Sequence, residues 1–132
     1  MCLHWQETQM TSNNMAQNNP TRRLDVVVVG AGFGGMYAVY KFNQMGLKIQ
    51  GFEAGSNVGG VWFWNRYPGA RVDLPSIDYS FGFSHEVEQE WTWSERYPGH
   101  AEIRKYINFV ANKFNLKKDI LFNEKVINAD KE

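Results

Sequence analysis

Three glycines and one glutamate have the types and the spacing of a site that binds phosphate and ribose. The glycines follow the pattern Gly-x-Gly-x-x-Gly at Gly30, Gly32 and Gly35, and Glu53 comes eighteen positions after the last of them. Gly30 would permit a tight turn, Gly32 a close approach of the backbone to a pyrophosphate, and Gly35 close packing of a helix on a strand. Unpaired N–H groups at the start of that helix would attract the phosphates. Glu53 would accept hydrogen bonds from ribose hydroxyls.

The acid also narrows the choice of ligand. A carboxylate beside the ribose disfavours a 2′-phosphate, so FAD or NAD is expected at this site rather than NADP. A Gly-x-Gly-x-x-Gly pattern can also be an incidental turn. Here it follows an apolar run, precedes a helical stretch and is succeeded by Glu53, so we interpret it as a dinucleotide fingerprint. The fingerprint does not separate FAD from NAD.

A second stretch of unusual composition runs from Gly59 to Asp73. It begins with a glycine pair, continues through two tryptophans, and contains a Pro-Gly turn flanked by arginines and an aspartate. The glycines would let the backbone lie near a cofactor, and the aromatic residues would form a wall of its site. Arg66, Arg71 and Asp73 would lie close together on one loop, where such charges are usually solvated. Trp91 and Trp93 alternate, which favours packing on the core.

Together these stretches resemble the Baeyer–Villiger monooxygenases, closest to the phenylacetone and cyclohexanone monooxygenase branch. Further matching segments are Glu90–Tyr97 and Tyr106–Ala111, and the resemblance extends from about Asp25 to Val126. It implies that Asp73 is a catalytic group beside the flavin, paired with an arginine that would lie beyond Glu132. The positions that it implies for cofactor binding are Gly30, Gly32, Phe33, Gly35, Glu53, Gly60, Val61, Trp62, Phe63, Trp64, Arg71, Asp73, Tyr79 and Val126.

The resemblance implies an enzyme that uses FAD, NADPH and O₂ to insert oxygen beside a ketone carbonyl, giving an ester or lactone. The small-molecule ketone and O₂ would be its partners. The family's second fingerprint, its segment with a histidine and Trp-Pro, and most of the NADPH site are not found in this sequence. We therefore expect an N-terminal part of an FAD domain that is inactive in isolation. Two alternatives stay open: a flavin-containing N- or S-oxygenase, and a catalytically silent fragment.

The elements that would position these residues belong to an α/β, Rossmann-like fold with a parallel sheet, incomplete at the C-terminal side. A β-branched strand over Asp25–Val29 should be buried on both faces. A helix from Met36 to Met45, stopped by Gly46, should lead into a strand at Leu47–Phe52. An amphipathic helix should cover His100–Phe114. Strand segments are expected at Ile120–Phe122 and Val126–Ala129, one of them the third parallel strand.

Composition excludes several other classes of function. The 14 basic and 14 acidic residues cancel, which argues against nucleic acid. Cys2 is the single cysteine and the three histidines lack ligand spacing, so no disulfide or metal site is expected. No apolar run approaches the roughly 20 residues that span a bilayer. Residues 1–23 lack a secretory pattern and are expected to be a disordered leader before the domain at 24–132. A cytoplasmic location is expected.

Overall fold

A strand–helix–strand unit lies at the base of the fold in this computed structural model, which describes residues 3–4 and 23–131. β2 (Val26–Val29) and β3 (Ile49–Glu53) are parallel neighbours, and α1 (Phe33–Gln44) connects them. Parallel neighbours need such a crossover because the chain must return to the same end of the sheet. The β-branched side chains of β2 favour an extended, pleated strand. The predicted Rossmann-like parallel unit is confirmed.

β3, rather than β2, is the strand that is buried on both faces. Every residue of β3 is buried, whereas in β2 only Val28 is, and Val29 is 65% exposed. β3 has a parallel neighbour on each side, because β4 (Ile120–Phe122) pairs with its second edge. Within the described residues, β2 pairs with β3 alone. The expectation that the strand at 25–29 is buried on both faces is therefore wrong.

α1 ends as the sequence predicts. Gly46 has a φ of +73°, and its N–H donates to the carbonyl of Asn43 over 3.0 Å. The N–H of Leu47 donates to the carbonyl of Phe42 over 3.2 Å. These two bonds form a Schellman motif, which satisfies carbonyls that the helix end would otherwise leave without partners. The helix begins at Phe33, three residues earlier than predicted, directly after the turn of the fingerprint.

The third parallel strand is β4, one of the two segments that the sequence predicts for it. The other segment, 126–129, does not form a strand, so that prediction is wrong. The chain changes direction just after β4. Asn123 has a left-handed φ of 61°, and its N–H donates to the carbonyl of Gly55 over 3.0 Å. The chain is thereby held beside the end of β3 instead of continuing as a new strand.

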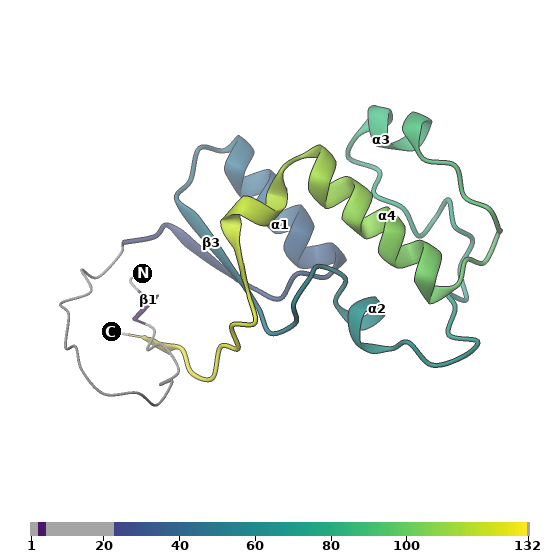
Figure 1. Cartoon of the computed structure of the whole chain (residues 1–132). Helices are drawn as coiled ribbons and strands as arrows, with labels where there is room; N and C mark the ends of the chain where they lie inside the picture. Colours follow the sequence, from purple (N-terminus) through teal and green to yellow (C-terminus); the bar gives the residue numbers. More distant parts are fainter. Residues whose placement is uncertain (1–2, 5–22, 132) are drawn as a thin grey trace.

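A separate pair of short strands is formed by residues from opposite ends of the chain. β1 (Leu3–His4) pairs antiparallel with β5 (Asp130–Lys131). β1 lies on the opposite side of the sheet from α4 (Figure 1). The predicted leader at 1–23 lies outside the described residues, apart from Leu3, His4 and Arg23.

The longest helix, α4 (His100–Lys113), supplies one side of the core. Its predicted apolar face is confirmed, because Ile103, Tyr106, Ile107 and Val110 are each at most 1% exposed. They belong to one buried cluster with Met36 and Val39 of α1, and Figure 1 shows α1 and α4 beside each other. Among the described residues, no helix is both long and apolar enough to cross a membrane.

Three short helical segments were not predicted. They are α2 (Val61–Trp64), α3 (His85–Glu90) and the 3₁₀ helix η1 (Leu116–Asp119). Segments of four to six residues are too short to show a helical period. α3 is tied to α4 by Lys113, whose Nζ lies 2.8 Å from a carboxylate oxygen of Glu90.

Candidate dinucleotide-binding site

The fingerprint turn fits closely between β2 and α1. Gly30 directly follows β2, and its N–H donates to the carbonyl of Phe52 over 2.8 Å, which extends the pairing of β2 with β3 by one residue. A Cβ at Gly35 would lie 1.9 Å from the carbonyl oxygen of Gly30. Only a residue without a side chain fits at Gly35, because the obstructing atom belongs to the backbone. The start of α1 is therefore pressed against the carboxyl end of β2.

The N-terminus of α1 suits an anion. Gly32 occupies the N-cap position, no side chain caps the helix, and its first turn contains no acidic residue. The first N–H groups of a helix have no partner within the helix, and they carry its partial positive charge. Because the first turn of α1 supplies no carboxylate and no capping side chain of its own, its N–H groups can receive the diphosphate of a dinucleotide.

Glu53 is buried at the carboxyl end of β3, beside this turn. It is 4% exposed, yet both carboxylate oxygens are hydrogen-bonded. Oε2 accepts from the N–H of Ala31 and Oε1 from the N–H of Gly55, each over 2.7 Å. Distances of this length are typical of charge-assisted hydrogen bonds. An ionised carboxylate offers about four acceptor positions, so capacity remains for ribose hydroxyls.

The second glycine stretch docks directly onto the fingerprint. The N–H of Gly59 donates to the carbonyl of Ala31 over 2.9 Å. Gly60 has a φ of +55°, and a Cβ built on it would lie 2.7 Å from the Cα of Gly32. The two loops thus meet backbone against backbone. The sequence identified both motifs but not their contact with each other.

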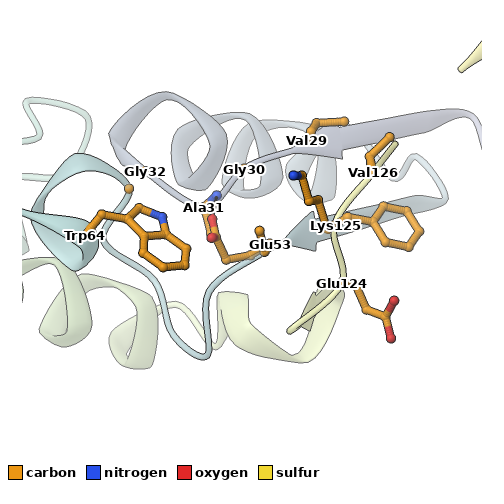
Figure 2. Close-up of a pocket in the computed structure, with 12 residues that line it drawn as sticks. Val29, Gly30, Ala31, Gly32, Glu53, Trp64, Glu124, Lys125 and Val126 are labelled. Carbon is orange, nitrogen blue, oxygen red and sulfur yellow. Dashed lines mark hydrogen bonds between the residues drawn. The ribbon is translucent and has the colours of Figure 1, made fainter. Parts of the chain in front are cut away.

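These elements enclose an open pocket of about 300 Å³. Figure 2 shows Glu53 at its centre, with Trp64 on one side and Lys125 and Val126 on the other. The pocket is lined by Val29, Gly30, Ala31, Gly32, Phe52, Glu53, Ala54, Gly60, Trp64, Glu124, Lys125 and Val126.

Six of the predicted cofactor positions line this pocket, namely Gly30, Gly32, Glu53, Gly60, Trp64 and Val126. Sequence reasoning missed Glu124 and Lys125, which follow β4 after Asn123. Ligands of parallel α/β sheets bind outside the carboxyl ends of the strands. The position of these two residues after the third strand was therefore a usable signal.

Three other predicted positions pack together away from the pocket. The indole N–H of Trp62 donates to the hydroxyl of Tyr79 over 3.0 Å, and the two rings meet edge to face. Phe33 contacts Tyr79 at a centroid distance of 5.1 Å. Trp62 is 9% exposed, so it joins the core, whereas Trp64 in the same helix is 61% exposed. The two tryptophans of α2 therefore differ in their surroundings.

Val61 and Phe63, also predicted at the cofactor, lie on other faces of α2. Val61 is 56% exposed. The ring of Phe63 lies under the guanidinium of Arg66, with 4.5 Å between the ring centroid and Cζ. A Cβ at Gly55 would lie 2.6 Å from this ring, so Phe63 packs over the turn that follows β3.

Arg71 and Asp73 lie on a separate exposed loop and do not line the pocket. The guanidinium of Arg71 bonds to a carboxylate oxygen of Glu95 over 2.7 Å and to the carbonyl of Tyr97. Arg66, Arg71 and Asp73 are all exposed, as expected for charges on a loop, and each arginine has a partner other than Asp73. The loop is extended here, since Arg71 forms an isolated antiparallel bridge with Gly99.

Two remaining expectations concern the tryptophans and metals. Trp91 and Trp93 pack against Tyr106 with centroid distances of 5.4 and 4.8 Å, which confirms their predicted place on the core. The part of the chain that the structure describes contains no group of three or more His, Cys, Asp or Glu residues able to hold a metal ion.

Residues 28–92 match a family model described as an NAD(P)-binding Rossmann-like domain. Cyclopentanone 1,2-monooxygenase of Comamonas sp. (strain NCIMB 9872) is 42% identical over 123 residues, covering 92% of this chain and 22% of the relative. A Baeyer-Villiger monooxygenase of Pseudooceanicola batsensis is 45% identical over 107 residues, covering 80% and 20%. A solved structure of oxidized steroid monooxygenase bound to NADP is 58% identical with a TM-score of 0.75, covering 76% and 19%.

Two further relatives bear on the ligand and the reaction. A structure of OTEMO in complex with FAD and NADP is 43% identical, has a TM-score of 0.72, and covers 76% of this chain and 19% of that one. Phenazine N-monooxygenase PhzNO1 of Lysobacter antibioticus is 40% identical, covering 78% and 19%. The chain spans about a fifth of the length of the relatives it matches. Over that fifth, the chain is homologous to the FAD-binding region of the Baeyer–Villiger monooxygenases.

Proposed function

We propose that this chain forms part of the FAD site of a flavin monooxygenase that inserts oxygen beside a ketone carbonyl. The observation that carries the proposal is the docking of the two glycine loops on each other, with the buried carboxylate of Glu53 between the turn after β2 and the turn after β3. Homology to ketone monooxygenases supports the reaction class. In this proposal residues 24–132 make up the first part of an FAD domain.

The residues present fit the adenosine and diphosphate portions of FAD. Glu53 would accept the ribose hydroxyls, and the uncapped start of α1 beside Gly32 would hold the diphosphate. Trp64 and Val126 would flank the adenosine from opposite sides of the pocket. The buried carboxylate would repel a 2′-phosphate, which favours FAD over NADP at this position.

Residues outside the pocket, among them Asp73 on its exposed loop, would serve the flavin portion. FAD supplies the redox and oxygen-transfer chemistry when bound, and the protein binds and orients it. We propose that Asp73 acts as a negative charge beside the flavin, and that Arg71 borders the nicotinamide of NADPH. Tyr79 would help to position the flavin, with its hydroxyl oriented by the indole of Trp62.

FAD titration of the chain tests the cofactor assignment. Tryptophan fluorescence and calorimetry should report binding to the wild-type chain, and Glu53→Ala should weaken it by about 10- to 150-fold, the cost of losing hydrogen bonds to a charged group. Glu88→Gln removes a carboxylate from exposed α3 and serves as the control. An unchanged affinity in Glu53→Ala would contradict the role of Glu53 at the ribose.

A chimaera tests the reaction. Residues 24–131 of this chain would replace the matching segment of a cyclohexanone monooxygenase, and ketone-dependent consumption of NADPH would be measured with the lactone product. Retained FAD and lactone formation support the proposal. A folded chimaera that lacks FAD contradicts it.

An N-oxygenase is the second candidate function, because the phenazine N-monooxygenase is nearly as similar as the ketone enzymes. The protein that carries this chain would be supplied with a cyclic ketone or an aromatic nitrogen heterocycle. A lactone as the product supports the ketone assignment, whereas an N-oxide alone supports this alternative.

A further inference from the structure

We propose that Glu53 is also a positioning residue, which assembles the nucleotide site through the protein's own backbone. This role rests on the proposed function in identifying the site, but it differs from the ribose contact. The carboxylate would hold two loops in their binding geometry, so that a nucleotide meets a site that is already formed.

The carboxylate of Glu53 accepts one backbone hydrogen bond from each of two turns. One oxygen accepts from the N–H of Ala31 in the fingerprint turn, and the other from the N–H of Gly55 in the turn after β3. Both distances are 2.7 Å and both bonds are buried. A buried carboxylate is costly unless it is hydrogen-bonded. The two hydrogen bonds to the turns therefore offset the cost of burying the carboxylate of Glu53.

Ala31 is held by hydrogen bonds on both sides of its backbone. Its N–H donates to Glu53, and its carbonyl accepts from the N–H of Gly59 over 2.9 Å. Ala31 is 1% exposed. Gly55 and Gly59 belong to the same connection between β3 and α2, so these bonds close a ring around the fingerprint turn. Removing the carboxylate opens this ring at two points.

The turn after β3 packs closely at Gly55. Gly55 has room for no side chain, because a Cβ would lie 2.6 Å from the ring of Phe63 and 3.1 Å from Oε1 of Glu53. The turn is thus packed against the carboxylate and the aromatic ring together. A glutamine at position 53 keeps the size of the side chain, but its amide NH₂ cannot accept. It would place a donor against one of the two backbone N–H groups.

Amide hydrogen exchange of the full chain, measured by NMR without added nucleotide, tests the proposal. The N–H groups of Ala31 and Gly55 should be protected in the wild-type chain. In Glu53→Gln the N–H that faces the new amide NH₂ should exchange about 10- to 150-fold faster, as expected for losing a hydrogen bond to a charged group. The other N–H keeps an amide oxygen as its acceptor and should change less. The N–H of Gly30, which pairs with β3, and that of Val110 within α4 should keep their protection. Glu88→Gln is the control for loss of a carboxyl group.

Wild-type amides of Ala31 and Gly55 that exchange as fast as unprotected loop amides would overturn the proposal, and so would unchanged protection in Glu53→Gln. The wild-type measurement decides the matter even when the variant does not fold. Because FAD is absent from this experiment, its outcome is independent of the FAD titration. A protein that binds FAD with unprotected amides refutes the positioning role alone, and protected amides without FAD binding refute the cofactor assignment alone.

Discussion

Replacing Gly35 by alanine should separate α1 from β2. The added Cβ would lie 1.9 Å from the carbonyl oxygen of Gly30, whereas ordinary contacts begin at 3.4 Å, so the helix must withdraw by about 1.5 Å. The obstructing atoms are backbone and cannot rotate away. The side chain of Val28, at 3.6 Å, is in ordinary contact and adds no clash.

The free-energy change can be bounded by comparison with the neighbouring glycine. Overpacking a core costs about 1–3 kcal/mol, and a clash of 1.5 Å with backbone belongs at the upper end. Alanine in a helix gains about 0.5–1 kcal/mol over glycine. A Cβ at Gly34 meets nothing within 4 Å, so Gly34→Ala receives this gain without the clash. The two variants should therefore differ in stability by about 3 kcal/mol, with opposite signs relative to wild type.

Urea unfolding followed by tryptophan fluorescence and circular dichroism measures this difference. Each variant is compared with the wild-type chain without nucleotide, so that effects on ligand binding do not enter. Gly34→Ala should shift the unfolding midpoint upward, and Gly35→Ala should shift it well downward or abolish the cooperative transition. If the unfolding free energies of the two variants lie within about 0.5 kcal/mol of each other, the close packing of α1 on the fingerprint turn is refuted.

Three further predictions concern other parts of the site. Gly60→Ala should weaken FAD binding at least about tenfold, because its Cβ would lie 2.7 Å from the Cα of Gly32. Gly69→Ala is the control, because its Cβ lies in open space and its φ is +83°. It should cost about 1–2 kcal/mol of stability and leave the affinity for FAD unchanged. Trp62→Phe and Tyr79→Phe should show a coupling of about 0.5–1.5 kcal/mol in a double-mutant unfolding cycle, and zero coupling would contradict their hydrogen bond. Asp73→Ala should change the free energy of unfolding by less than about 0.5 kcal/mol, because the side chain is exposed. In the chimaera it should slow ketone-dependent NADPH consumption at least about tenfold. A wild-type rate would place Asp73 outside the active site.

The sequence determined those features that depend on local chain geometry. The fingerprint glycines and the β-branched run predict a turn between strand and helix, and Gly46 predicts the end of α1 through its left-handed backbone. The apolar spacing within His100–Phe114 predicts the buried face of α4. Glu53 was recognised as a candidate site residue because its distance from the glycines is set by the length of one crossover.

Which strand is buried on both faces, and which segment forms the third strand, depend instead on how the strands pair. A run of four valines indicates a buried strand, but burial on both faces needs neighbours, and β3 has two while β2 pairs only with β3 in the described residues. The segment 126–129 has a suitable composition for a strand. The left-handed Asn123 and its bond to Gly55 direct the chain elsewhere, and neither follows from local propensity.

The tertiary structure alone decided which of the candidate residues meet. Gly60 reaches Gly32 because two separate loops are brought together by packing. In the single turn of α2, Trp62 enters the core and Trp64 faces the pocket, a choice set by the position of Tyr79 and not by the tryptophans themselves. Contacts between residues distant in sequence depend on the whole packed fold, whereas composition and spacing describe only what each segment brings to it.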